Sequence, residues 1–268
     1  MTPAGSITTQ AQRAERLRQL HAGPDLLVLP NAWDALSARA VEAAGFPVVA
    51  TTSAGVAEAL GYADHEQAPV EEMLAALRRI ASAVAVPVTA DMEAGYGLDP
   101  AELAERVIAA GAVGLNLEDS DHRPGRLLVD AEAQAERLAA VKAAGQRARV
   151  DLVLNARIDV HLRQVGAPEH RLEEALRRAR LYRQAGADGV YPIGVCDEPT
   201  IRAFLEQLSA PLNILVRPGC PPLAHLAILG VRRASLGPFL VRASVQHLRQ
   251  LLDQLGSGAD VFDGMLAG

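Results

Sequence analysis

The sequence contains few aromatic residues and few cysteines. Phe, Tyr and Trp make up 3% of its 268 residues, whereas half of all residues are hydrophobic. A hydrophobic core must therefore be built from aliphatic side chains. The two cysteines, Cys196 and Cys220, form neither a CxxC motif nor a metal-binding spacing. We expect both to be free thiols of a protein in a reducing compartment.

Long apolar runs and an excess of positive charge are also absent. The chain has no run of about 18 uncharged apolar residues, so no membrane-spanning helix is expected. Residues 1–10 lack the basic and then apolar layout of a signal peptide. The formal net charge is −6, whereas nucleic-acid binders usually carry a basic stripe. These features argue against membrane and nucleic-acid partners and favour a cytoplasmic protein that acts on a small molecule.

One pattern recurs along the chain: an amphipathic helix, then a glycine, then a short apolar run. It begins at Glu42, Ile108, Arg183 and Ala227. Glycine suits the end of a helix because it adopts the left-handed conformation without a Cβ penalty. Runs that are apolar almost throughout are typical of parallel strands buried on both faces.

Eight such runs alternate with helical patterns, and an additional helix precedes the first run. The predicted strands are 26–29, 48–52, 88–91, 114–118, 152–157, 189–191, 212–216 and 234–236. The predicted helices include 9–21, 70–83, 101–110, 131–144, 172–184 and 239–255. This alternation predicts an α/β fold, a (βα)₈ TIM-type barrel with an N-terminal helix. No linker divides the chain, so we expect a single domain over 1–268. A Rossmann-type sheet is rejected because no G-x-G-x-x-G motif follows the first strand.

Polar residues gather where the predicted strands end, which is where TIM barrels place their active sites. They are Thr51, Thr52, Ser53, Asp91, Glu93, Asn116, Glu118, Asp119, Asn155, Arg157, Asp159 and Asn213. Three carboxylates at one barrel mouth, those of Asp91, Glu93 and Glu118, would repel one another unless a cation lies among them. Oxygen ligands without His or Cys favour Mg²⁺ or Mn²⁺. The alternative is that these acids pair with arginines or cap helices.

Two features at the strand ends suit an anionic substrate. The segment Ser53, Ala54 and Gly55 offers backbone N–H groups and a hydroxyl to a carboxylate or phosphate. Arg157 is the stronger candidate, because a guanidinium binds a carboxylate through two parallel hydrogen bonds.

These residues resemble the isocitrate lyase/phosphoenolpyruvate mutase superfamily. The resemblance runs through 29–34, 52–55, 61–64, 90–97, 117–119 and 156–159, and the stretch around Asp91 is the most specific. It implies that Asp91 is the main protein ligand of Mg²⁺. It also implies that the water molecules around the ion are held by Asp64, Glu93 and Glu118. It further implies that the substrate is bound by Ser53, Ala54, Gly55, Arg157 and Asn213. In similar proteins the C-terminal helices exchange between subunits, so a homodimer or homotetramer is expected.

The resemblance also implies a chemistry. A 2-oxo acid can chelate Mg²⁺ through its carboxylate and carbonyl oxygens, and the ion then stabilises the enolate that forms when the adjacent bond breaks. We therefore expect a Mg²⁺-dependent lyase or hydrolase that cleaves a C–C bond of a small 2-oxo (di)carboxylic acid, oxaloacetate-like or methylisocitrate-like.

The sequence departs from the superfamily pattern at several positions. The Cys-Gly-His loop of the lyases is replaced by the shorter stretch 118–125, in which His122 is a candidate general acid/base. Glu93 stands where those lyases usually have Asp, and Thr51 stands in place of a mutase-like aromatic. Two alternatives therefore stay open. One is phosphorus–carbon chemistry, as in a phosphonopyruvate hydrolase or a carboxyphosphonoenolpyruvate-type mutase. The other is a 2-oxo acid-binding homologue with weak catalysis.

Overall fold

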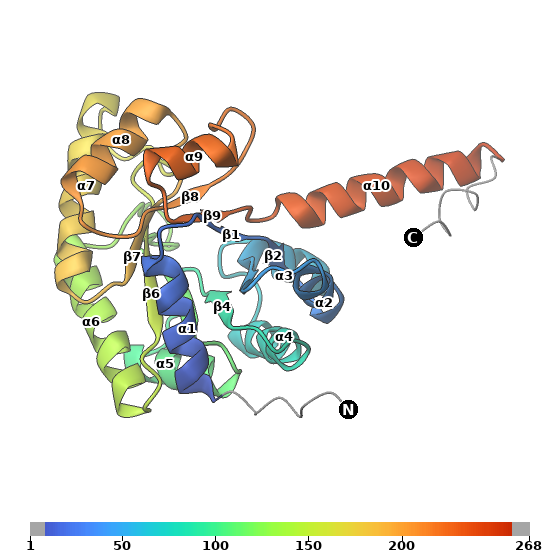
Figure 1. Ribbon diagram of the computed structural model, residues 1–268, viewed down its shortest axis with the longest axis horizontal. Coiled ribbons are helices and arrows are strands. Elements are labelled where there is room, and N and C mark those ends of the chain that lie inside the picture. The colour runs from blue at the N-terminus through green and yellow to red at the C-terminus, as the bar shows by residue number, and fades with distance from the viewer. Residues whose placement is uncertain (1–8, 259–268) are drawn as a thin grey trace.

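The structure, a computed structural model, describes residues 9–258 and contains a closed barrel of parallel strands (Figure 1). The strands of this part of the chain are β1 (Leu27–Leu29), β2 (Asn31–Ala32), β3 (Val49–Thr51), β4 (Val88–Asp91), β5 (Gly114–Glu118), β6 (Val153–Ile158), β7 (Gly189–Pro192), β8 (Asn213–Leu215) and β9 (Arg233–Ser235). All eight predicted strands are confirmed, and so is the barrel.

Two short breaks interrupt the ladder of strands. Strands β2 to β7 pair in sequence order, and β8, β9 and β1 form the remaining segment. A bridge between Val190 and Leu212 joins β7 to β8. The first predicted strand, 26–29, corresponds to β1, and the structure adds the short strand β2 after Pro30, which interrupts the ladder because proline has no N–H to donate.

Helices surround the barrel and begin at local capping signals. They are α2 (Ala35–Ala43), α3 (Ser53–Leu60), α4 (Val70–Ser82), α5 (Pro100–Ala109), α6 (Ala131–Arg147), α7 (Pro168–Gln184), α8 (Glu198–Gln207) and α9 (Leu223–Leu229). Asp34, Asp99, Asp130 and Asp197 each accept a hydrogen bond from a backbone N–H of the first turn that follows. These caps are local in sequence, so they favour each helix before any tertiary contact forms.

Helix α1 (Gln10–Ala22), the predicted N-terminal helix, covers the end of the barrel at which the strands begin. Its Leu17 is fully buried and lies against Gly114, the first residue of β5, where an added Cβ would approach the Leu17 Cδ2 to 2.8 Å. Its His21 is buried with Nε2 at 3.4 Å from the Arg233 Nη1 of β9. The opposite end of the barrel is left open.

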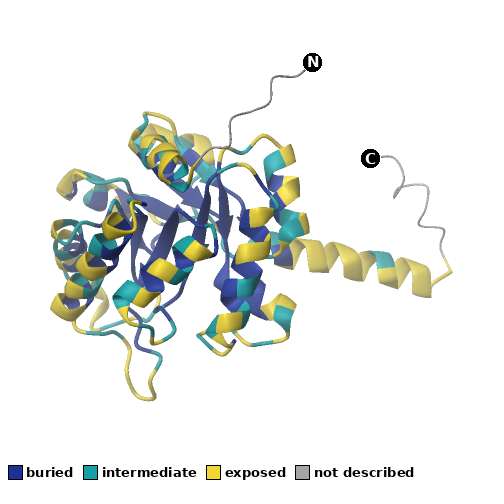
Figure 2. Ribbon diagram, turned by 90° about the horizontal axis from the view of Figure 1, so that it is seen from below, coloured by how far each residue is buried: buried dark blue, intermediate teal, exposed yellow. Residues whose placement is uncertain are grey.

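Helix α10 (Phe239–Gly256) extends away from the barrel, and most of its surface is exposed (Figures 1 and 2). Val241 near its start is buried, whereas the side chains further along form an apolar stripe. Val245, Leu248, Leu252 and Leu255 are 41–55% exposed. In the part of the chain that the structure describes, no helix is long and apolar enough to cross a membrane.

The prediction that Cys196 and Cys220 are free thiols is wrong. The two residues form a disulfide, with their Cα atoms 4.8 Å apart. Cys196 follows β7 and Cys220 follows β8, which are neighbouring strands. The loops after neighbouring parallel strands leave the same end of the barrel, so residues 24 positions apart meet there.

We predict that His21 makes the fold sensitive to acid. Burial lowers the pKa of His21 to about 3, and the Arg233 and Arg18 guanidinium groups act in the same direction. The unfolded chain takes up the proton near the usual value of 6.5, so stability is lost as the pH falls from 6.5 toward 3, by at most about 1.4 kcal/mol per pH unit.

The variant His21→Gln should therefore show a shallower pH dependence of the free energy of unfolding in this window, measured by urea denaturation. The control is His247→Gln on the exposed part of α10, which should keep the wild-type slope. Equal slopes for wild type and His21→Gln would contradict the prediction.

Candidate active site at the barrel mouth

Asp91, the last residue of β4, is held against the first turn of α3. Its Oδ2 accepts hydrogen bonds from the Ser53 backbone N–H at 3.1 Å and the Ser53 hydroxyl at 2.8 Å. Its Oδ1 lies 3.4 Å from Nδ2 of Asn116, the residue that pairs with it in β5. A carboxylate is stabilised at a helix N-terminus, where free N–H groups and the helix dipole both favour negative charge. These contacts orient the Asp91 carboxylate.

The predicted anion-binding segment Ser53, Ala54 and Gly55 forms the buried first turn of α3. The Ser53 N–H already donates to Asp91, and the Gly55 N–H lies 3.4 Å from the Thr52 hydroxyl. A Cβ at Gly55 would lie 3.1 Å from Val241 of α10, so glycine is also required for packing. Substrate binding by this turn stays a prediction.

Glu93 follows β4 and brings the predicted acids together. Its Oε2 accepts from the Glu66 N–H at 2.8 Å, and its Oε1 accepts from the Tyr96 hydroxyl. The pKa of Glu93 is raised to about 8, chiefly by burial and also by the charges of Asp91, Asp64 and Glu118, against the opposing effect of the Tyr96 hydrogen bond. The charges of the other three predicted acids therefore act on Glu93, although within residues 9–258 no three of these four acids bring ligand atoms within 4.8 Å of one another.

Glu118 at the end of β5 connects these acids to two basic side chains. Its Oε2 is 2.5 Å from the Arg157 Nη1, and its Oε1 is 3.0 Å from the His122 Nε2. Burial raises the pKa of Glu118, although Arg157 opposes the shift. The contact with Glu118 in turn raises the pKa of His122, which keeps the imidazole protonated closer to neutral pH.

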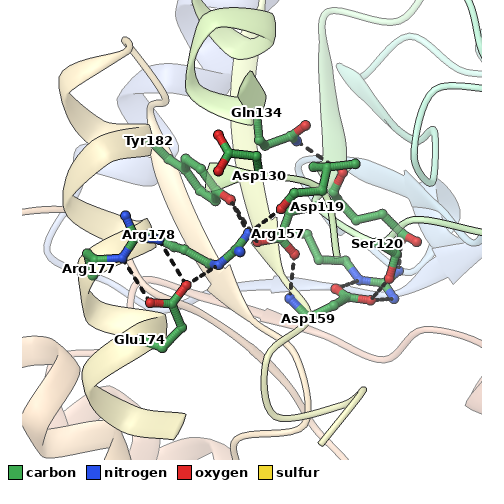
Figure 3. Close-up of polar contacts among 12 residues, drawn as sticks. Asp119, Ser120, Asp130, Gln134, Arg157, Asp159, Glu174, Arg177, Arg178 and Tyr182 are labelled. Carbon is green, nitrogen blue, oxygen red and sulfur yellow. Dashed lines mark hydrogen bonds and ion pairs between the residues drawn. The ribbon is translucent and has the colours of Figure 1, made fainter. Parts of the chain in front are cut away.

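Arg157 of β6 is fixed by Asp159, which it grips through two hydrogen bonds of 2.7 Å (Figure 3). The Ser120 hydroxyl also donates to Asp159, at 2.8 Å. A guanidinium has five N–H donors, so the contacts with Asp159 and Glu118 leave one N–H free on each terminal nitrogen. Those two remaining donors suit a substrate carboxylate.

A second buried carboxylate lies behind this pair. The Asp119 Oδ1 accepts from the Asp159 N–H at 2.8 Å, and its Oδ2 accepts from Arg178 Nη1 at 3.0 Å and the Tyr182 hydroxyl at 2.7 Å (Figure 3). The sequence analysis did not identify Arg178 or Tyr182. Their spacing on α7 is that of ordinary helical residues. No local sequence signal shows that they contact Asp119, which follows β5.

Asn213 lies in the barrel interior and not at the mouth. Its Nδ2 is 3.3 Å from the Ser235 hydroxyl, and its Oδ1 has no hydrogen-bond partner among residues 9–258. In the same interior, the Asn116 Oδ1 accepts from Asn155 at 2.8 Å and from Arg233 at 3.0 Å. Contact between Asn213 and a substrate stays a prediction.

A cavity of about 630 Å³ lies between the loops that follow α3, β4 and β5 and helix α6. Its lining includes the loop residues His65, Glu66, Ser120, Asp121 and His122, and Arg137 of α6. His65 was not among the predicted metal ligands. His122 lines this cavity, whereas its lining residues do not include Arg157 or the predicted acids Asp64, Asp91, Glu93 and Glu118.

Comparison with known proteins gives consistent matches over most of the chain. A family model described as phosphoenolpyruvate phosphomutase matches residues 17–255. A candidate phosphonomutase of known structure from Burkholderia cenocepacia is 41% identical, with a TM-score of 0.85 over 91% of this chain and 100% of that chain. A 2,3-dimethylmalate lyase, described as a PEP mutase/isocitrate lyase superfamily member, is 30% identical, with a TM-score of 0.80 over 91% of this chain and 87% of that chain. The oxaloacetate decarboxylase of Rhodopseudomonas palustris is 30% identical over 92% of this chain and 86% of its own length.

We predict that the Arg178 side chain is essential for stability whereas its neighbour Arg177 is not. Arg178→Met leaves the buried Asp119 carboxylate without its cation, which should cost about 3–5 kcal/mol of unfolding free energy. Arg177→Met on the same helix removes ion pairs of a side chain that is 45% exposed, and should cost about 1 kcal/mol or less. Chemical denaturation of both variants measures the difference, and similar losses would contradict the prediction.

Proposed function

The chain belongs to the phosphoenolpyruvate phosphomutase family, whose superfamily consists of lyases and mutases, and from this premise we propose a specific reaction for it. The chain is an enzyme of that superfamily, with the TIM-barrel fold. We propose that it uses a divalent metal, Mg²⁺ or Mn²⁺, to cleave the C–C bond next to the carbonyl of a small 2-oxo acid. The convergence of Asp91, Glu93 and Glu118 with Arg157 at the barrel mouth carries this proposal.

The side chains at the mouth fit a hard divalent cation. Asp64, Asp91, Glu93 and Glu118 supply only oxygen ligands, which Mg²⁺ and Mn²⁺ prefer. The raised pKa of Glu93 reflects burial and the repulsion of the other three carboxylates, and a cation among them would relieve that repulsion. Asp91 would bind the ion directly, and the other three acids would hold its water molecules. Such an ion acts as a Lewis acid toward the carbonyl oxygen of the substrate.

Arg157 and His122 supply the remaining groups. The two free N–H donors of Arg157 point to recognition of the substrate carboxylate, with the guanidinium fixed by Asp159. His122, whose pKa is raised by its contact with Glu118, would donate a proton to the substrate carbon from which the carboxylate departs as CO₂. A dicarboxylate such as oxaloacetate is the proposed substrate, since the R. palustris oxaloacetate decarboxylase matches 92% of this chain.

Phosphorus–carbon chemistry is the second candidate. The family model is that of phosphoenolpyruvate phosphomutase, and the B. cenocepacia protein that is 41% identical is named a candidate phosphonomutase. A phosphonate group would occupy the same anion-binding position beside Arg157. Release of inorganic phosphate from phosphonopyruvate, without turnover of oxaloacetate, would favour this candidate.

We also propose that the protein is a homo-oligomer. The side chains of the apolar stripe of α10 are 41–55% exposed within residues 9–258, since most of the helix extends away from the barrel. A groove of about 690 Å³ beside the start of α10 is lined mostly by apolar side chains, including Trp33, Leu36, Phe46, Leu223, Leu236 and Leu240. A stripe and a groove on one chain are complementary surfaces for a dimer or tetramer.

We predict that Asp91→Asn abolishes metal-dependent ligand binding. Titration calorimetry with oxaloacetate and pyruvate, in Mg²⁺ and in EDTA, should show that the wild type binds a ligand only with Mg²⁺. An activity assay should then show that the wild type turns over a ligand that it binds. Asparagine keeps the size of the side chain but removes the charge that attracts the ion. The control Asp25→Asn changes an exposed acid far from the mouth and should bind normally. Unchanged binding and turnover in Asp91→Asn would contradict the assignment of the metal ligand.

We predict that Leu252→Glu disrupts the oligomer. Light scattering coupled to gel filtration should give a dimer or tetramer for the wild type and a smaller species for the variant, because a charge would be buried in the proposed interface. The control Gln250→Glu introduces the same charge on α10 outside the apolar stripe and should retain the wild-type mass. A monomeric wild type would refute the interface.

A further inference from the structure

The geometry points to a second metal site at the barrel mouth, formed by His65, Glu93 and His122, which takes a transition-metal ion such as Zn²⁺. One ligand atom from each of the three residues lies within 4.8 Å of those of the other two. The residues come from the loop after α3, the segment after β4 and the loop after β5. This site shares Glu93 with the oxygen-only site centred on Asp91 but adds two imidazoles, and its ligand set does not require the proposed function to be correct.

The ligand types favour a softer ion than Mg²⁺. Two imidazoles and one carboxylate are a frequent set for Zn²⁺ and for Fe²⁺, whereas Mg²⁺ selects oxygen ligands. Each carboxylate oxygen of Glu93 accepts one hydrogen bond, from Glu66 or from Tyr96. Because a carboxylate oxygen has two lone pairs, one on each oxygen is left for a metal.

The two histidines already face each other across the mouth. Their ring centroids are 5.4 Å apart, with the rings tilted by 38°. The His122 Nε2 is buried and lies near Glu118, but it is not aligned for a hydrogen bond with any described residue. A tetrahedral site with bonds of about 2.1 Å needs ligand atoms about 3.4 Å apart. Rotation of the exposed His65 side chain can supply the required approach.

The backbone around this site is held in an unfavourable conformation. His65, Glu66 and Glu93 have φ values of 69°, 57° and 46°, in the left-handed region that favours glycine. Each such residue costs on the order of 1 kcal/mol and persists only where its surroundings enforce it. The hydrogen bond from the Glu66 N–H to Glu93 joins the two strained segments, so His65 is presented beside Glu93 by the fold itself.

An ion at this site would compete with the reaction. Glu93 belongs to the proposed Mg²⁺ site and His122 is the proposed proton donor, so coordination would withdraw both. The ion would also tie the loop that carries His65 to the loop that carries His122, across the cavity of about 630 Å³. Zn²⁺ bound here would therefore inhibit the reaction, a consequence that rests on the proposed function.

Cobalt binding tests the site directly, because Co²⁺ replaces Zn²⁺ and absorbs visible light when imidazoles bind it. The full chain, saturated with Mg²⁺, should bind one Co²⁺ with a visible absorption band. His65→Asn should weaken this binding at least about tenfold, since loss of a supporting residue alone usually costs 10–100-fold. Asparagine is chosen because it tolerates the left-handed backbone of residue 65. His122→Asn should have the same effect.

His247→Asn is the matched control, because it removes an exposed histidine on α10, and it should bind Co²⁺ as the wild type does. Equal Co²⁺ affinity in wild type and His65→Asn would overturn the inference. A second result would also overturn the inference: Co²⁺ displaces Mg²⁺ when it binds, and Asp91→Asn, but neither histidine variant, abolishes Co²⁺ binding. Mg²⁺-dependent binding of 2-oxo acids, measured without Co²⁺, reports on the proposed function separately.

Discussion

Arg157 lies between the carboxylates of Glu118 and Asp159 at the ends of β5 and β6, and the burial of these charges constrains the barrel mouth. A buried ion without a partner is far more costly than a paired one, so each charge must meet its counterpart. Asp159 is further held by Ser120, and the Asp119 behind it by Arg178 of α7. Because each buried charge is paired in this way, the Arg157 guanidinium is held in a fixed orientation toward the site.

The other side of the mouth is organised differently. Asp91 and Glu93 form no ion pair with an arginine or lysine among residues 9–258, and their contacts are hydrogen bonds from Ser53, Glu66 and Tyr96. These donors orient the carboxylates but carry no full positive charge. One half of the mouth is therefore neutralised by the protein, whereas the carboxylates of the other half have no cationic partner among residues 9–258.

The opposite end of the barrel serves stability. There α1 fills the base with Leu17, and the neutral His21 lies against the buried Arg233. Arg233 in turn reaches Asn116, whose amide approaches Asp91. A continuous set of polar contacts thus links the base of the barrel to its mouth. The residues that stabilise the barrel thus lie at its base, and the candidate site lies at its mouth. The mouth can therefore retain residues with an unfavourable backbone conformation, such as Glu93.

The sequence by itself determined the barrel, its N-terminal helix and the candidate acids. Apolar strands, helix caps and glycines at helix ends are local signals, and they repeat with each βα unit. It also identified Asp91, Glu93, Glu118 and Arg157 as one group, since parallel strands deliver their last residues to the same end. Only the tertiary structure decided what those residues contact. The Cys196–Cys220 disulfide, the Arg178–Asp119 pair and the approach of His65 to His122 each join separate βα units. Such contacts depend on the lengths and paths of loops around a closed barrel, which residue spacing along the chain does not encode.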